Sequence, residues 1–199
     1  MKENIIRVEN FAKFSAVAGS TGKCVTVTDS DGNETGFEVR GMLTKFNFVN
    51  ANGMTFEPES YDKFIDEYYI ANGLNVPLCL LHDDTDIRNV CGYVKELTKT
   101  DDGVEMVAFI PKSTYYYNLI RNYVECGVLQ GFSNFGCVTD FDFTEGGALI
   151  VKSFELLHAA MVCIPADTSA KFVQNTIFKN FEPSQRSAAA EDEDIDLIV

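Results

Sequence analysis

Short strand-like segments separated by turn residues make up most of this sequence, and they restrict its fold more than any other feature does. Apolar residues alternate or run together, as is typical of β-strands, in the segments 23–28, 37–48, 76–81, 90–97, 104–110, 128–143 and 148–164. Glycine, asparagine and aspartate gather between several of them, as at 29–33, 101–103 and 144–147. The pattern predicts an α+β fold whose centre is an antiparallel barrel or a strongly curled sheet.

Helical spacing of apolar residues occurs at three places. After Pro58, which suits a first helical turn, apolar side chains recur with helical period at Tyr61, Phe64, Ile65, Tyr68 and Tyr69. A second helix is expected from a cap at Ser113 to an end at Cys126–Gly127. A third is expected to start at Asp167 and to end before Pro183.

The length and charge of the chain limit its domain count and its partners. Its 199 residues suit one domain, which we expect at 23–182, between an N-terminal leader at 1–22 and an acidic, disordered tail at 183–199. Sixteen basic and thirty acidic residues give a formal net charge of −14, so nucleic acid is not an expected partner. No segment has the length of a membrane span or the apolar core of a signal peptide, so we expect no membrane partner and an intracellular location.

The chain has two histidines, His82 and His158, and both stand in apolar surroundings. His82 ends the run 76–82 and is followed by two aspartates, whereas His158 lies within the apolar run 154–165. Ser133 lies between them in the chain, in a turn bracketed by Gly131 and Gly136. Histidine is the usual proton carrier near neutral pH, so these residue types suggest a hydrolase.

In such a hydrolase each of the three residues has a distinct role. Ser133 is the candidate nucleophile, His82 the base that takes its proton, and His158 the group that orients the base. Glu155 and Asp83 are alternatives for the orienting role. Taken singly, a serine in a glycine turn and a histidine in an apolar strand are more often structural, so the spacing alone is weak support.

The cysteines raise two competing possibilities. Cys79, His82 and Cys91 have gaps that match no familiar zinc finger and no clear fourth ligand follows, so we expect no metal and no other cofactor. Cys137 or Cys163 could serve a small cysteine-dependent hydrolase instead. The six cysteines form no CxxC pair and mostly lie in apolar segments, where small buried thiols are common.

Five pieces of the chain between about Val39 and Lys171 resemble, in the same order, the prohead proteases of tailed phages. These serine peptidases of the HK97 type clear scaffold from immature capsids, and they are distantly similar to the herpesvirus assemblins. The matching pieces are an opening strand and its turn into a helix at 39–58, the histidine strand Val76-Pro77-Leu78-Cys79-Leu80-Leu81-His82, a hairpin at 92–104, the nucleophile loop Gly131-Phe132-Ser133-Asn134-Phe135-Gly136, and a closing strand and turn at 155–167.

The resemblance implies a fold like that of the assemblins, a small antiparallel β-barrel surrounded by helices, with self-association common. By position, it makes His82 the general base and Ser133 the nucleophile. Many phage members have an acidic residue at the position of His158, whereas the assemblins use a second histidine there; Glu155 remains the alternative third member. We expect Ser133 Oγ and a ring nitrogen of His82 to lie within about 3 Å or somewhat more.

This sequence also departs from the family around the nucleophile. It has Ser133-Asn134-Phe135-Gly136 where the family usually has Ser-Ile-Gly-Phe, and the oxyanion hole is the feature that this change affects. Oxyanion donors are usually backbone N–H groups. We expect them in the turn after the closing strand, at Ala166 and Asp167.

The function implied is that of a prohead serine endopeptidase that cleaves scaffold and capsid-protein extensions during phage head assembly. Its substrates would be scaffold and major capsid protein, and its place would be the host cytoplasm, inside the prohead. The small residues at 187–190 resemble sites that such proteases cut, which suggests self-cleavage; a plain linker is the simpler interpretation. The alternative function is a non-catalytic capsid-assembly or scaffolding module on the same fold.

Overall fold

The fold was analysed in a computed structural model, which describes residues 23–70 and 75–172. The strands are β1 (Cys24–Thr28), β2 (Glu34–Lys45), β3 (Met54–Phe56), β4 (Pro77–Leu80), β5 (Val90–Lys99), β6 (Gly103–Pro111), β7 (Gly131–Phe143) and β8 (Leu149–Val162). Every segment predicted as a strand is confirmed as one. The sequence pattern missed β3, which is too short to show a period of two.

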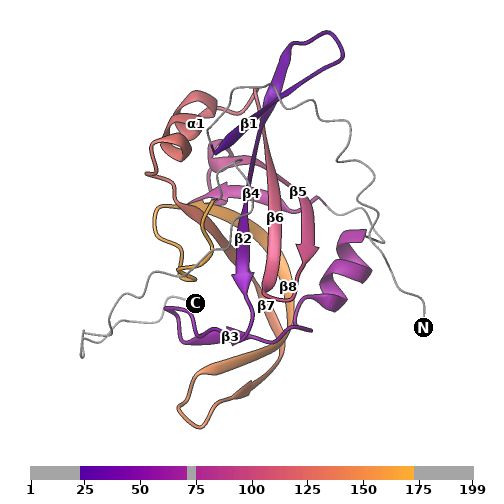
Figure 1. The fold of residues 1–199 in the computed structure, drawn as a ribbon, viewed down its shortest axis with the longest axis vertical. Helices are drawn as coiled ribbons and strands as arrows, with labels where there is room; N and C mark the ends of the chain where they lie inside the picture. The colour runs from indigo at the N-terminus through magenta and orange to yellow at the C-terminus, as the bar shows by residue number, and fades with distance from the viewer. Residues whose placement is uncertain (1–22, 71–74, 173–199) are drawn as a thin grey trace.

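All eight strands belong to one sheet (Figure 1). Its order is β1-β2-β6-β5-β4-β8-β3, and β7 pairs with β8 beside this path. The pairs β1–β2, β2–β6, β5–β6, β4–β5 and β7–β8 are antiparallel, whereas β8 runs parallel to both β3 and β4. The long strand β8 therefore lies between β4, which leads into the turn with the candidate base His82, and β7, which carries the candidate nucleophile Ser133.

The expectation of a closed antiparallel barrel surrounded by helices is wrong. The structure is 52% strand and 13% helix, and its single sheet is open. Between β7 and β2 the described chain has only isolated bridges, Gly131 with Lys171 and Gly41 with Phe172. Closing the sheet into a barrel would require β7 and β2 to pair directly, but the short segment 170–172 lies between them. Such long-range pairing leaves no mark in the local period of a sequence.

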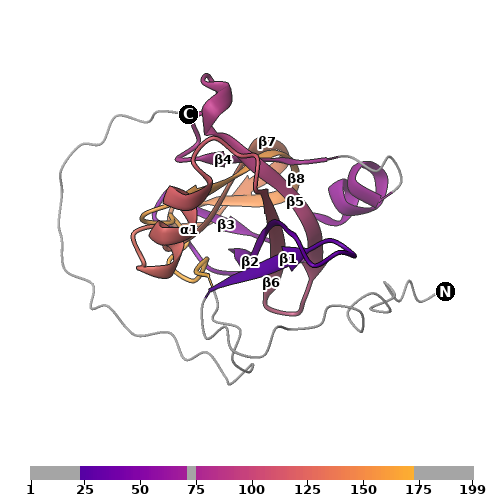
Figure 2. The ribbon, with the colours of Figure 1, turned by 90° about the horizontal axis from the view of Figure 1, so that it is seen from above.

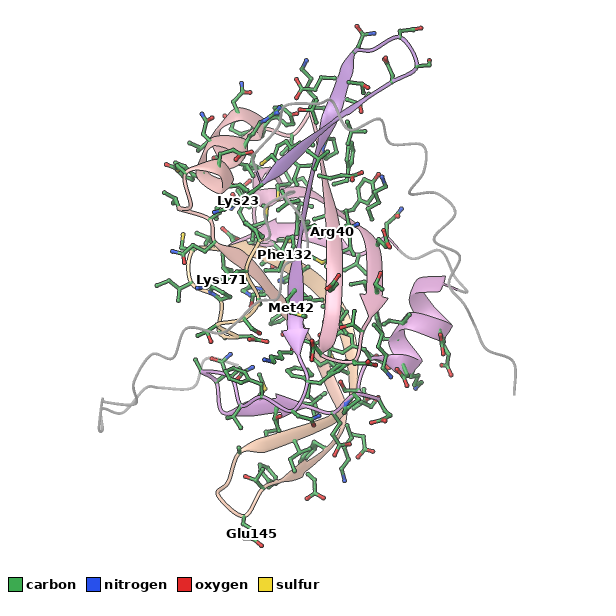
Figure 3. The ribbon with its side chains drawn as sticks, viewed as in Figure 1. Lys23, Arg40, Met42, Phe132, Glu145 and Lys171 are labelled. Carbon is green, nitrogen blue, oxygen red and sulfur yellow. The ribbon has the colours of Figure 1, made fainter. Side chains whose placement is uncertain are left out.

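Glycine allows this segment to approach the sheet. A Cβ placed on Gly41 would lie 2.5 Å from the carbonyl oxygen of Lys171, and one on Gly131 would lie 1.7 Å from that of Ala170. Only a residue without a side chain fits at such distances. Figure 3 shows Lys171 beside Phe132 at the start of β7, with Glu145 far away at the tip of the β7–β8 hairpin.

Two helices longer than a single turn accompany the sheet in the described parts of the chain. They are the π-helix η2 (Phe64–Ile70) and α1 (Tyr117–Glu125), while η3 (Ile87–Asn89) is one turn of 3₁₀ helix. Figure 2 shows η2 and α1 on opposite sides of the curled sheet. None of the helices in these parts is long and apolar enough to cross a membrane.

The helix boundaries differ in part from those predicted. The first predicted helix is confirmed in place, but with π rather than α hydrogen bonding. The second begins at Tyr117 without a side-chain cap, so the predicted cap at Ser113 is wrong, whereas its end at Cys126 and Gly127 (φ 79°) is confirmed. The third is wrong over 167–172, which form turns and bridges; its remainder lies outside the described residues, as do the leader at 1–22 and the tail at 183–199.

The core lies inside the curve of the sheet. Phe37, Leu78, Ile110, Phe132 and Met161, from five different strands, are all at most 1% exposed. Full burial of one such side chain contributes about 1.5–3 kcal/mol. Because Phe132 and Met161 flank the candidate site, the backbone beneath the site is held by the core itself.

Candidate active site

The candidate base His82 follows the end of a buried strand. Leu78 and Cys79 of β4 are at most 1% exposed, and β4 pairs in parallel with residues 159–161 of β8. One more backbone bond, from Leu81 N–H to the carbonyl of Met161 (3.1 Å), continues this pairing past the strand end. His82 therefore lies two residues past the strand, in a turn whose start is fixed against β8.

The turn holds two consecutive side-chain-bearing residues in the left-handed region, Leu81 (φ 53°) and His82 (φ 60°). This conformation costs an L-residue roughly 1–2 kcal/mol. The turn is closed by a hydrogen bond from Asp83 N–H to the carbonyl of Leu80 (3.0 Å). Strain of this kind persists where the surrounding structure imposes it, and it is concentrated at functional sites.

The two histidines lie in contact although 76 residues separate them in the chain. His82 Nδ1 and His158 Nε2 are 3.1 Å apart, a hydrogen-bonding distance, and the ring centroids are 5.3 Å apart. His158 is 5% exposed, whereas His82 is half-buried. The inner ring is thus fixed and the outer ring has one nitrogen, Nε2, free of this bond.

Burial sets the protonation of both rings. It lowers the pKa of His82, and the neighbouring His158 lowers it further. Burial also lowers the pKa of His158, although the negative charge of Asp84 acts in the opposite direction and raises this pKa. A neutral imidazole is the form that can accept a proton, so both shifts favour the state that a general base needs near pH 7.

Phe135 of β7 covers the inner histidine. Its ring is stacked on that of His158 with centroids 4.7 Å apart and an interplanar angle of 13°, and the two residues are register partners between β7 and β8. The Phe135 ring is also 6.1 Å from that of His82. The aromatic face therefore restricts rotation of His158 and identifies the side of β7 that faces the histidine pair.

Ser133 lies on that same side of β7. It precedes Phe135 by two residues, and the register is regular between them, so the two side chains share one face of the strand. Its register partner is Ala160 of β8, which also pairs with Cys79 of β4. Ser133 and the end of β4 thus flank the same part of β8, although no hydrogen bond within the described residues joins Ser133 Oγ to either histidine.

Asn134, the residue by which this sequence departs from the usual nucleophile loop, points the opposite way. Its Nδ2 donates to Oη of Tyr61 at 2.8 Å, and Tyr61 is fully buried. Burial raises the pKa of Tyr61, which therefore stays a neutral phenol. This bond ties the residue after Ser133 to the core.

The carboxylates near the site differ in what they contact. Asp83 accepts from Thr85 and Asn89 and so holds the turn after His82, while Glu155 has no hydrogen bond or ion pair with either histidine in the described chain. Asp84 is the acidic residue that reaches the pair, with its Oδ2 3.8 Å from Nδ1 of His158. Sequence reasoning missed Asp84, although it noted the two aspartates after His82.

The predicted oxyanion residues lie in a turn that is itself well anchored. Ala166 accepts a bond from Ala51 N–H (3.0 Å), and the buried carboxylate of Asp167 accepts from Lys45 N–H (2.7 Å) and Ser169 N–H (2.9 Å). The same turn leads into Ala170, whose carbonyl accepts from Phe132 N–H beside Ser133. None of the hydrogen bonds among the described residues uses the N–H groups of Ala166 and Asp167 as donors.

The cysteines do not form a comparable site. Cys79 and Cys91 are buried; burial raises the pKa of both, to about 12 for Cys91, so they remain thiols. Cys137 is exposed opposite Glu155, and Cys163 is half-buried. The described residues include no group of three or more histidine, cysteine or acidic side chains arranged to hold a metal ion.

Comparison with known proteins gives similar sequences and a similar fold. No family model matches the chain. The probable capsid maturation proteases of Lactococcus phages p2 and SK1 are each 27% identical to it over 179 residues, which span 86% of this chain and 92% of theirs. Among solved structures, the capsid assembly protease gp21 of bacteriophage T4 has a similar fold, with a TM-score of 0.56 at 15% identity over 70% of this chain and 91% of that one.

Proposed function

We propose that the chain is a phage prohead protease and a serine endopeptidase with Ser133 as nucleophile, His82 as general base and His158 as the residue that orients His82. One observation carries this proposal. It is the 3.1 Å contact between the only two histidines of the chain, made on the side of the sheet that Ser133 shares. Two histidines brought into contact from distant parts of the chain are better suited to relaying a proton than to filling a hydrophobic core.

The reaction follows from this arrangement. Ser133 Oγ attacks the carbonyl carbon of the scissile peptide bond while Nε2 of His82 takes its proton. Nδ1–H of His82 donates to Nε2 of His158, which keeps Nε2 of His82 free for the serine and stabilises the imidazolium that forms. That imidazolium then protonates the leaving amine, and water repeats the sequence on the acyl-enzyme.

Histidine in the third position makes the enzyme slow. A neutral imidazole brings no negative charge to the imidazolium of His82, whereas the aspartate of a conventional triad does. Slow turnover suits a confined maturation step that each substrate undergoes once. The oxyanion of the tetrahedral intermediate is held by backbone N–H groups of the turn at Ala166 and Asp167, whose donors are not used elsewhere in the described chain.

The substrates are the scaffold and the extensions of the major capsid protein, cut inside the prohead as it assembles in the host. The names of the relatives support this role, since they describe capsid maturation and capsid assembly proteases. The protease domain spans 23–182, and copies of the chain associate with one another. Self-cleavage at 187–190 is the alternative to a plain linker there, and the mass of the chain after incubation separates the two, since an intact C-terminus argues for the linker.

The second candidate is a non-catalytic capsid-assembly module on the same fold. It is favoured by one observation, the lack of a hydrogen bond from Ser133 Oγ to either histidine within the described residues. Apo proteases also show such loose geometry, because the contact tightens when substrate binds. The two candidates therefore differ in what they predict for cleavage rather than in resting geometry.

Cleavage during assembly separates them. The chain is expressed together with its scaffold and major capsid protein, and both partners are followed by mass. The wild type is expected to shorten them, and Ser133→Ala to leave both at full length. The control is Ser153→Ala, another strand serine, whose hydroxyl accepts a hydrogen bond from that of Thr139 (2.8 Å); it should cleave as the wild type does. Cleavage by Ser133→Ala would overturn the serine mechanism, and normal assembly without any cleavage by the wild type would support the second candidate.

A further inference from the structure

Two polar side chains of the turn after β4 lie next to the buried ring of His158. His82 and Asp84 are two residues apart, and both contact His158. His82 meets it at Nε2, and Asp84 approaches it at Nδ1, the other ring nitrogen. His158 therefore has a histidine at one ring nitrogen and a carboxylate near the other, with Phe135 stacked on its face.

The tautomers of the two rings follow from the proposed function. If His82 is the base, its Nε2 must be unprotonated, so its proton is on Nδ1 and is donated to Nε2 of His158. His158 accepts at Nε2, so its own proton is on Nδ1, the nitrogen that faces Asp84. A carboxylate beside Nδ1 favours this tautomer over the one that would break the contact between the histidines.

We infer that Asp84 is a positioning residue of the protease, which fixes the tautomer of His158 and supplies the negative charge that the Ser133–His82–His158 arrangement otherwise lacks. The inference rests on the proposed function. With Asp84 included, the interacting groups of the site run from Ser133 through the two histidines to a carboxylate that is exposed to solvent. Asp84 does not contact the reacting atoms and acts only through His158.

The distance and exposure of Asp84 set the size of its effect. At 3.8 Å from Nδ1 it is beyond ordinary hydrogen-bonding distance, and its side chain is 60% exposed, so water screens the interaction. Two unit charges about 4 Å apart in water interact weakly, and the loss of this charge should lower kcat about fivefold. That is far less than the loss expected for a member of the catalytic triad.

The other charged groups around His158 do not duplicate this role. Asp83 is turned towards Thr85 and Asn89, and Asp86 pairs with Arg88. Cys79 of β4 lies near the turn, but burial, followed by the charges of Asp84 and Asp83, raises its thiol pKa and keeps it neutral. On β7 the neighbour is the uncharged Phe135. Asp84 is thus the acidic group of the described residues that faces the pair.

Proton NMR of the two histidines tests the coupling directly. With two histidines in the whole chain, a preparation without a histidine tag gives one Hε1 ring signal for each. The pair titrates as a coupled unit, and the negative charge of Asp84 favours its protonated form. Asp84→Asn should therefore shift the titration to lower pH, and Asp84→Glu, which keeps the charge, should restore it. Asp86→Asn is the matched control, because asparagine also caps η3, and it should titrate as the wild type does.

Peptidase kinetics complete the test. Asp84→Asn is expected to lower kcat about fivefold and to move the acid limb of its pH profile to lower pH, with KM unchanged; Asp84→Glu should recover both. A mere structural role would lower the rate without moving the limb. An unchanged titration, or full kcat in Asp84→Asn, would overturn the inference while leaving the protease intact. A wild type without peptidase activity would overturn the proposed function itself, and the catalytic role of Asp84 with it.

Discussion

At the scale of single residues, the candidate site depends on how three side chains are held rather than on their identity alone. His82 is held by a strained left-handed turn, His158 by burial and by the stacked ring of Phe135, and Ser133 by the neighbouring bond from Asn134 to Tyr61. The bond from Asn134 reaches the buried Tyr61 on the core side of the sheet, whereas Phe135, which is 43% exposed, lies on the opposite face with the histidines. The site is therefore preorganised by packing, which is the usual condition for efficient proton transfer.

The role of His158 is the first prediction at this scale. His158→Ala should lower kcat about 100-fold or more, because His82 loses the partner that fixes its tautomer. Glu155→Gln is the comparison, since Glu155 has no contact with either histidine in the described chain, and it should change kcat little. Peptide turnover measured for both variants decides the third member. Unchanged turnover in His158→Ala with loss in the Glu155 variant would make our assignment wrong.

The sequence predicted these residues unevenly. His82 and Ser133 could be proposed because each stands in a local motif that resembles one in the phage proteases. Asp84 and Phe135 could not be ranked, because their importance comes from contacts with His158, which lies more than 20 residues from Phe135 and more than 70 from Asp84 in the chain. The contact between Asp84 and His158 can be recognised only when the pairing of β4 with β8 is known.

At the scale of secondary-structure elements, β7 is the strand on which the account depends. It pairs with β8 along one edge, while its other edge is met at its start by residues 170–172. Phe132 N–H donates to the carbonyl of Ala170, and Phe172 N–H to that of Gln130, both at 2.9 Å. These bonds fix the backbone immediately before Ser133.

A substitution at Gly131 tests this element. Gly131→Ala would put a methyl group 1.7 Å from the carbonyl oxygen of Ala170, so the segment at 170–172 must move, and the free energy of unfolding should fall by about 2 kcal/mol or more. Gly146→Ala is the control, because its methyl group would meet nothing nearer than Thr144 Oγ1 at 3.8 Å. Urea unfolding of both variants measures the difference. Equal stabilities would show that the contact at 170–172 does not hold β7.

Element types were predictable where the local period is clear, and element boundaries were less so. The strands around His82 and Ser133 follow from apolar runs, whereas η2 was expected as an α-helix and is a π-helix. The helix α1 begins at Tyr117 and not after the predicted cap at Ser113. A cap or a change of helix type depends on a few backbone bonds that packing decides, and such bonds leave little trace in the sequence.

At the scale of the whole molecule, the sheet is open and mixed rather than a closed antiparallel barrel. The difference arises from β8, which runs parallel to β3 and β4 and antiparallel to β7. A sequence shows where strands are but not which distant strands pair. The resemblance to the assemblins suggested a closed antiparallel barrel; the parallel pairs of β8 contradict the antiparallel part, and the lack of pairing between β7 and β2 contradicts the closure.

Stability should depend on pH in a window set by the two histidines. Both have folded pKa values below the ordinary value of 6.5. The unfolded chain therefore binds more protons just below that pH, and stability falls as the pH drops through 6.5 towards the folded values. Carboxylates with lowered pKa, such as Glu34 beside the Tyr117 hydroxyl, act in a separate window at lower pH.

The measurement is the free energy of unfolding at about pH 7.5 and about pH 5.5. The wild type should be less stable at the lower pH, and the double variant His82→Gln/His158→Gln should show a much smaller difference. An equally steep loss in the double variant would mean that other groups carry the dependence. Such a result would contradict our view that both histidine rings are buried in their neutral form.

The central claim, that Ser133 is an activated nucleophile, is tested most directly by covalent labelling with a fluorophosphonate followed by peptide mapping. We expect one phosphonylated residue, Ser133, with labelling lost in His82→Ala and retained in Ser153→Ala. Labelling of another residue, or peptidase activity that survives with Ser133 unlabelled, would contradict it.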